Sequence, residues 1–235
     1  MTSNNCQAQR KHQLASRLIS WGSNRAESYP WRETTDPYKI LVAEILLRKT
    51  TRKQVEKVFR QFTRRFPTVE ALSKASVREI KKIIAPLGME RVRAVGLSKL
   101  AKVLSTKYDG KVPVERDSLL ELPNVGPYTA NALMCLAFDQ QVPLVDTNAI
   151  RVVTRVFSIT SRRSRPHTDP GLWTIVASLI PSGDARRFNL AILDLGSSLC
   201  LHTSPKCLEC PLLELCDYGV KNTRSRSLAL HLSDC

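Results

Sequence analysis

One stretch decides how this chain folds: Leu122-Pro123-Asn124-Val125-Gly126-Pro127-Tyr128-Thr129-Ala130. Asn and Gly suit a tight turn, and the proline after them suits the first position of a helix. The apolar run that follows predicts a helix over 128–138 that is buried on most sides. Such a turn presents backbone N–H groups to an anion, and Gly126 lacks the Cβ that would block close approach. A tight connection between two helices explains the stretch equally well.

A single aspartate follows at the end of the apolar run 142–145. Asp146 is expected to begin the next helix and to accept a hydrogen bond from the backbone N–H of Asn148 or Ala149. A helix N-terminus favours negative charge, so this carboxylate is also suited to stabilise an oxocarbenium-like transition state or to activate water. Capping and catalysis are compatible, and the residue types leave both open.

Four cysteines have the spacing of a metal centre. The array reads C-x6-C-x2-C-x5-C and consists of Cys200, Cys207, Cys210 and Cys216. Four thiolates so spaced can bind either tetrahedral zinc or a [4Fe–4S] cluster. One short pair flanked by two single cysteines favours the cluster, because zinc sites more often contain two short pairs. We therefore expect a [4Fe–4S] cluster, with zinc as the alternative.

The composition favours a globular protein that binds an extended anion. The 235 residues include 36 Lys and Arg against 21 Asp and Glu, which gives a net charge of +15. Nucleic acid or an anionic membrane surface would suit this charge. No apolar segment approaches the about 18 residues that span a bilayer, and the polar N-terminus lacks a signal-peptide apolar region. Because clustered cysteines suit a reducing compartment, we expect a cytoplasmic, nucleoid-associated protein without membrane partners.

Hydrophobic spacing predicts helices throughout, and the alternation typical of strands is scarce, so the expected fold class is all-α. A first helix is expected over 7–21, ending before Gly22. Over 38–66 we expect either one long helix or two helices joined near Thr50-Thr51. Thr68 and Ser76 are predicted N-caps, with Glu79 completing a capping box at Ser76. Further predictions are helices over 94–107, 117–122, 148–157, 172–180 and 188–199, a basic loop at 162–165 and an irregular tail over 218–235.

The chain resembles the helix–hairpin–helix DNA glycosylases of the endonuclease III superfamily. The resemblance rests on LPNVGPYTANALMCLAF, on VDTNAIRVVTRV and on the cysteine array, in that order along the chain. It implies two helical lobes, with the scissile nucleotide bound between them. Residues 36–145 would form a six-helix barrel with the helix–hairpin–helix motif, and residues 1–35 and 146–235 an iron–sulfur cluster lobe built from both termini. The implied partner is double-stranded DNA with a mismatched or damaged base, bound by a monomer.

The resemblance also implies roles for individual residues. Asp146 matches the essential aspartate of the family, and Asn124, Val125, Gly126 and Thr129 match the hairpin that binds the DNA backbone. Asn124 departs from the glycine that is usual in the family. Asn is the next most tolerant residue of left-handed backbone geometry, so the hairpin is expected to form.

Tyr128 is the position that separates subfamilies. Members that also nick the strand have a lysine here, and adenine-DNA glycosylases typically have a serine, whereas tyrosine is similar to the thymine-DNA glycosylases. A phenol with a pKa near 10 does not readily form an imine, so we expect base removal without strand cleavage. The alternative role for Tyr128 is a half-buried core aromatic.

Glu44 lies within an apolar helical segment, and helical spacing places Arg48 one turn on. The alternatives for Glu44 are a surface ion pair with Arg48 or, by resemblance, a hydrogen bond to the edge of the flipped base. Arg48 and Lys49 replace a pair of glutamines of the adenine enzymes. They are therefore candidates to fill the gap in the duplex or to contact the opposite guanine.

The sequence thus predicts a monofunctional DNA glycosylase that hydrolyses the N-glycosidic bond of T or U mispaired with G, with Asp146, Tyr128 and Glu44 as catalytic residues. One alternative is an adenine-DNA glycosylase acting opposite G or oxidised G, although the chain ends soon after the cysteines and leaves no room for the extra C-terminal domain of those enzymes. Another is a non-catalytic DNA-binding iron–sulfur protein.

Overall fold

The computed structural model describes residues 3–25 and 28–223. Within these ranges every regular element is a helix, which confirms the predicted all-α class. The chain divides into two compact units. We call Glu27–Gln140 the hairpin unit, and Met1–Ala26 with Gln141–Cys235 the cysteine unit. No helix in the described ranges is long and apolar enough to cross a membrane.

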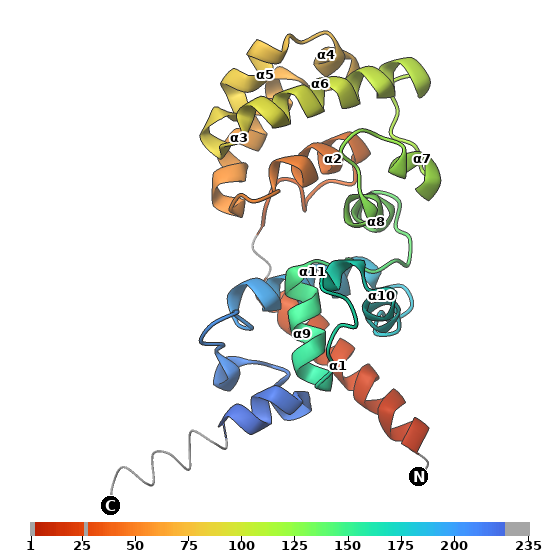
Figure 1. The fold of residues 1–235 in the computed structure, drawn as a ribbon, viewed down its shortest axis with the longest axis vertical. Helices are drawn as coiled ribbons and strands as arrows, with labels where there is room; N and C mark the ends of the chain where they lie inside the picture. Colours follow the sequence, from red (N-terminus) through yellow and green to blue (C-terminus); the bar gives the residue numbers. More distant parts are fainter. Residues whose placement is uncertain (1–2, 26–27, 224–235) are drawn as a thin grey trace, which may run out of the picture. The chain divides into compact units, whose positions relative to one another are not determined.

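The hairpin unit is a set of helices around one core (Figure 1). The long α6 packs against α4 and α5, while α2 packs against α3 and α8. Phe62, Phe66 and Leu97 are fully buried in this core. The elements are α2 (Pro37–Leu46), α3 (Arg52–Arg65), α4 (Val69–Ser73), α5 (Val77–Ile84), η1 (Ala85–Leu87), α6 (Glu90–Lys107), α7 (Arg116–Leu120) and α8 (Pro127–Leu136).

The cysteine unit joins the first helix of the chain to residues 141–235. Helix α11 packs against both α1 and α9, so it forms the centre of this unit. Phe188 and Leu18 are fully buried there. The elements are α1 (Ser3–Arg25), α9 (Thr147–Phe157), η2 (Pro166–Thr168), α10 (Pro170–Ala177), α11 (Ala185–Ser198), η3 (Cys207–Glu209) and η4 (Leu213–Leu215).

Local capping sets several helix starts. The Ser76 hydroxyl accepts from the backbone N–H of Glu79, and the Glu79 carboxylate accepts in return from the backbone N–H of Ser76, as predicted. Thr68 also caps its helix, as predicted. A further capping box at Thr51 starts α3, so the segment 38–66 forms two helices rather than one.

The prediction that the first helix ends before Gly22 is wrong, because α1 continues to Arg25. Gly22 instead marks close packing. A Cβ at this position would lie 2.6 Å from the Cβ of Ala191 on α11. The missing side chain therefore lets two helices approach each other, and it does not end the helix.

The prediction of an irregular tail over 218–235 is wrong for residues 218–223. Residues 217–223 are helical, and the remainder of the tail, 224–235, lies outside the described residues.

Candidate active site

The predicted hairpin connects α7 to α8. The backbone N–H of Val125 donates to the Leu122 carbonyl at 3.1 Å, which closes the turn. Asn124 has a φ of 62°, so it adopts the left-handed conformation expected from its tolerance of that geometry. Leu122 and Val125 are buried and anchor the turn to the core, while Asn124 is exposed.

The helix start at Gly126 is open to an external group. Gly126 is the N-cap of α8, and no side chain caps the helix there. A Cβ added to Gly126 would meet no atom within 4 Å, and its φ of −106° is accessible to any residue. Packing and backbone geometry therefore do not require a glycine at this position. Space beside uncapped helix N–H groups is what a phosphate oxygen needs.

Two arginines brace the hairpin from within its own unit. Arg48 donates from Nη2 to the Asn124 carbonyl and to the Thr129 hydroxyl, the latter at 3.2 Å. Arg93, which is only 7% exposed, donates from Nη2 to the Arg48 carbonyl and to the Thr50 hydroxyl, the latter at 2.6 Å. Arg48 thus has a defined intramolecular role, and its contact with DNA stays a prediction. Sequence reasoning missed Arg93, because its partners Arg48 and Thr50 lie more than 40 residues away.

Glu44 is buried on α2, with 9% of its surface exposed, so it does not lie at the surface. It faces the charge of Arg48. Burial lowers the pKa of the Arg48 guanidinium, and the Glu44 carboxylate opposes this shift. The pKa of Arg93 is lowered by burial and further by the Arg48 charge. Glu44 therefore partly balances a local excess of positive charge behind the hairpin.

Lys49 and Tyr128 occupy distinct positions in the hairpin unit. Lys49 is exposed with a φ of 51°, and with Asn124 it lines a cavity of about 150 Å³. Tyr128 is the second residue of α8 and is half-buried. Lys49 thus lies beside the hairpin and Tyr128 within it, and their predicted roles stay predictions.

Asp146 begins α9 in the cysteine unit, as predicted. Its Oδ1 accepts from the backbone N–H groups of Asn148 and Ala149, each at 2.8 Å. Its Oδ2 accepts from Nδ2 of the Asn148 side chain, also at 2.8 Å. Three donors therefore fix the orientation of this half-buried carboxylate.

A chain of hydrogen bonds links Asp146 to the cysteine array. The Asn148 side-chain oxygen accepts from Nη2 of Arg151 at 2.7 Å. Arg151 in turn donates to the carbonyls of Cys200 and Gly196, each at 2.6 Å. A Cβ at Gly196 would lie 2.5 Å from the Cβ of Asn148, so this glycine permits the contact between α11 and α9. Sequence reasoning did not identify Asn148 or Arg151 as positioning residues, although both lie in the VDTNAIR motif.

None of the four cysteines of the array forms a disulfide bond. The pKa of the Cys210 thiol is raised to about 11, chiefly by burial. The backbone N–H of Leu212 lowers it, while the charges of Cys200, Cys216 and Cys207 raise it. The other three thiols are therefore near enough to Cys210 to shift its pKa, and the metal centre stays a prediction. Among the described His, Cys, Asp and Glu side chains, however, no group of three is placed to hold a single metal ion.

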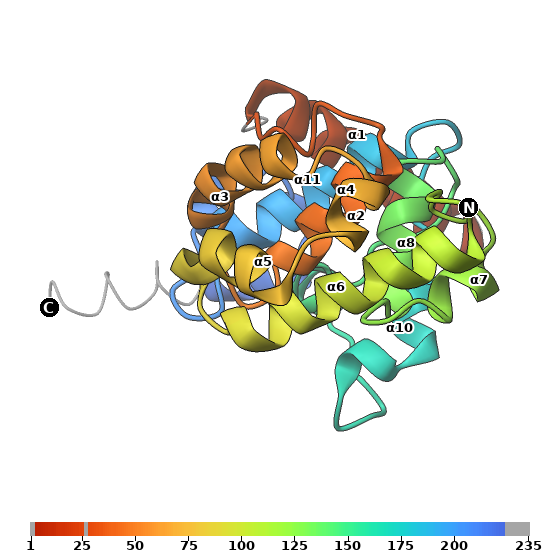
Figure 2. The same ribbon diagram turned by 90° about the horizontal axis from the view of Figure 1, so that it is seen from above.

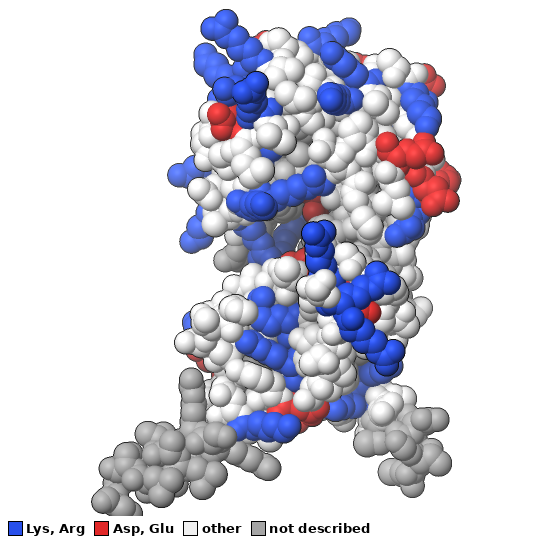
Figure 3. Space-filling model, in the orientation of Figure 1, with Lys and Arg blue, Asp and Glu red and all other residues white. Residues whose placement is uncertain are grey.

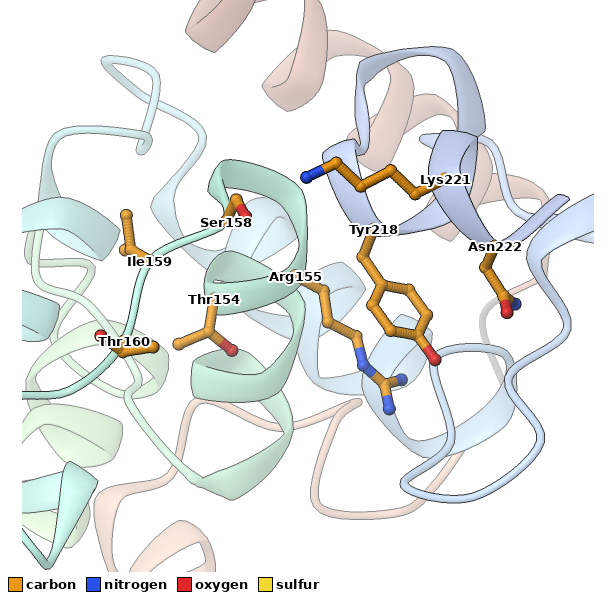
Figure 4. A pocket seen from close by; sticks show the side chains of 8 residues that line it. All are labelled: Thr154, Arg155, Ser158, Ile159, Thr160, Tyr218, Lys221 and Asn222. Atoms are coloured by element: carbon orange, nitrogen blue, oxygen red, sulfur yellow. The ribbon is translucent and has the colours of Figure 1, made fainter. Parts of the chain in front are cut away.

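N–H donors surround the sulfur atoms of the array. Arg155 donates from Nη1 to Sγ of Cys200 at 3.4 Å, and the Gly219 backbone N–H donates to Sγ of Cys216 at 3.3 Å. The Arg155 guanidinium also lies over the Tyr218 ring, with its Cζ atom 4.6 Å from the ring centroid. These two side chains lie side by side in the wall of a cavity of about 470 Å³ (Figure 4). Such donors stabilise thiolates.

Comparison with known proteins gives a consistent picture. Residues 42–177 match the model of the HhH-GPD superfamily base excision DNA repair proteins. The chain is 46% identical over 211 residues to a thymine/uracil-DNA glycosylase of Pyrobaculum aerophilum, covering 88% of this chain and 92% of that protein.

Solved structures agree. A thermostable thymine-DNA glycosylase superposes with a TM-score of 0.85 at 37% identity, covering 91% of this chain and 98% of that one. Endonuclease III in a non-covalent complex with DNA superposes with a TM-score of 0.75 at 28% identity, with the same coverage of each chain.

Proposed function

The chain belongs to the HhH-GPD superfamily of base excision DNA repair proteins, and we propose that it is a monofunctional DNA glycosylase that removes thymine or uracil mispaired with guanine. One observation carries the proposal: the carboxylate of Asp146 is fixed by three hydrogen-bond donors at the start of α9. The names of the relatives supply the substrate class, thymine and uracil in DNA.

DNA binding is assigned to the hairpin. The open N-terminus of α8 at Gly126 would receive a backbone phosphate, with Asn124, Val125 and Thr129 shaping the turn around it. Such contacts fix the register of the protein on the duplex and do not read sequence. A wobble pair is easier to open than a matched pair, which contributes to selection of the mispaired base.

Catalysis is assigned to Asp146, Tyr128 and Glu44. As the C1′–N1 bond breaks, the pyrimidine leaves with the bonding electrons, and positive charge develops on the sugar. The Asp146 carboxylate would stabilise that charge and assist water, whose oxygen bonds to C1′ while its proton is released. Glu44 would accept a hydrogen bond from the edge of the base. Tyr128 would line the pocket without forming a covalent bond.

Cys200, Cys207, Cys210 and Cys216 would hold a [4Fe–4S] cluster. A tetrahedral zinc ion with bonds of about 2.3 Å needs its sulfur atoms within about 4 Å of one another, whereas a four-iron cluster takes ligands from a wider arc. The C-x6-C-x2-C-x5-C spacing, with one short pair flanked by two single cysteines, therefore favours the cluster. When bound, the cluster would cross-link the segment that contacts α9. We place the protein in the cytoplasm, associated with the nucleoid, as a monomer on duplex DNA.

The test is incubation of the purified protein with G·T, G·U, G·A and abasic duplexes, followed by alkaline cleavage. We expect product from G·T and G·U only after alkali, because the enzyme itself does not nick the strand. Product from G·A alone would favour the adenine-DNA glycosylase, and binding of the duplexes without any product would favour a non-catalytic protein.

A further inference from the structure

The segment between α9 and α10 is a strongly basic loop. We call residues 161–168 the arginine loop. Arg162, Arg163 and Arg165 are all exposed, and the structure records no ion pair for them within the described part of the chain. The segment projects away from the rest of its unit beside α10 (Figure 2). Lys and Arg side chains also gather over this part of the unit (Figure 3).

The backbone of this loop is held in place by one buried carboxylate. Asp169 is 7% exposed, and its Oδ2 accepts from the Arg162 backbone N–H at 2.8 Å and from the Ser161 hydroxyl at 2.9 Å. Its Oδ1 accepts from the Gly171 N–H at 3.0 Å at the start of α10. These hydrogen bonds hold the pKa of Asp169 below its ordinary value, and the bond from the Arg162 backbone N–H contributes most. Asp169 therefore serves the loop and the helix cap at once.

Further contacts hold the second half of the loop. The Thr168 hydroxyl donates to the Arg165 carbonyl at 2.8 Å, and Nε1 of Trp173 donates to the His167 carbonyl at 2.9 Å. Backbone polar groups are thus bonded within the loop while the guanidinium groups point to solvent. Because the loop backbone is already fixed, binding has to order chiefly the arginine side chains, and three exposed guanidinium groups favour a polyanionic partner.

We propose that the arginine loop is a second contact for the DNA backbone, on the cysteine unit and separate from the hairpin, and that Asp169 is its positioning residue. The inference rests on the proposed function only in taking duplex DNA as the partner. The predicted contact is with phosphates, because residues 161–168 offer three fork-shaped guanidinium donors and contain no carboxylate.

The first experiment replaces the three arginines together. In R162Q/R163Q/R165Q, the slope of log Kd against log salt for a fluorescein-labelled matched duplex should become shallower by about 2 to 3, since each phosphate contact contributes about 0.9. The charge-matched control K74Q/R78Q/K82Q changes three exposed residues of the hairpin unit and should alter the slope by less than about 1. An unchanged slope in the loop variant, or an equal change in both, overturns the proposal.

The second experiment separates loop geometry from net charge. In Asp169→Asn, the remaining carbonyl oxygen can still cap α10, whereas the new amide group opposes the N–H of Arg162. The variant is more positive than the wild type, so charge alone would tighten DNA binding. We expect weaker binding, by about threefold or more, with a shallower salt slope. Tighter or equal binding by protein with an unchanged Tm overturns the positioning role.

Base excision is measured in parallel with enzyme in excess over a G·U duplex at saturating concentration. Both loop variants should keep the wild-type single-turnover rate, because the loop does not touch the reacting nucleotide in this proposal. A slowed rate at saturation overturns that separation. If the wild type itself removes no base, the proposed function fails, whereas the salt slopes on the matched duplex still decide the proposal about the loop.

Discussion

The side-chain amide of Asn148 donates to Oδ2 of Asp146 at 2.8 Å, and the same side chain accepts from Arg151 at 2.7 Å. Asn148 therefore transmits the position of Arg151 to the carboxylate. Because Arg151 also binds the Cys200 carbonyl, the carboxylate and the first cysteine of the array belong to one hydrogen-bonded set. A change at either end is expected to reach the other.

Replacing Asp146 by Asn should abolish base removal and leave mismatch binding intact. The amide keeps the size of the carboxylate and removes the negative charge that the transition state needs, so the single-turnover rate should fall on the order of 10³-fold or more. The measurement pairs excision kinetics with a binding titration on a G·T duplex. Substantial retained turnover would remove Asp146 from its assigned role.

Asn148→Ala should slow excision by up to about 10²-fold without weakening DNA binding, because a misplaced carboxylate loses productive geometry. Thr147→Ala is the matched control, since Thr147 is exposed beside it on the first turn of α9. Single-turnover rates and Kd values are compared for both variants. Equal rates in the two variants would show that Asn148 does not orient Asp146.

Tyr128→Lys should add strand nicking if the half-buried second residue of α8 faces the sugar. An amine at this position could form an imine with C1′, which borohydride reduces to a stable protein–DNA adduct. The adduct is resolved by denaturing gel electrophoresis on a G·U duplex, with Tyr128→Phe as the control that cannot trap. No adduct from folded, DNA-binding protein would argue that the geometry forbids the reaction.

Gly126→Ala should weaken DNA binding and leave the fold intact. Its Cβ would meet no protein atom within 4 Å, so the free energy of unfolding should change by less than about 0.5 kcal/mol. Gly22→Ala is the contrasting variant, because its Cβ would lie 2.6 Å from the Cβ of Ala191 and should lower the free energy of unfolding. Denaturant unfolding and a duplex titration check both; undiminished affinity in Gly126→Ala would contradict the phosphate site.

The cysteine array should carry iron. We expect broad absorbance near 400 nm and about four iron atoms per chain in the purified protein. Cys210→Ser should reduce both. Stoichiometric zinc without this absorbance would instead identify a tetrahedral site.

Sequence reasoning succeeded where the signal is local. The caps at Ser76 and Asp146 depend on donors two or three residues away, and the turn at Asn124 depends on its own backbone. It failed at Gly22, whose role is set by Ala191 on a distant helix. The bond between Arg151 and Cys200 was missed for the same reason, since 49 residues separate the two.

The packing of α1 against α11 also constrains the order in which the protein can form during synthesis. Helix α1 leaves the ribosome before α11, so Leu14 and Leu18, which are buried in the folded protein, lack the cover of α11 until residues 185–198 have been made. The hairpin unit is continuous in sequence, so all of its residues emerge before that point. The growing chain must therefore carry the uncovered apolar face of α1 past the synthesis of an entire unit, which exposes the nascent protein to aggregation during that interval.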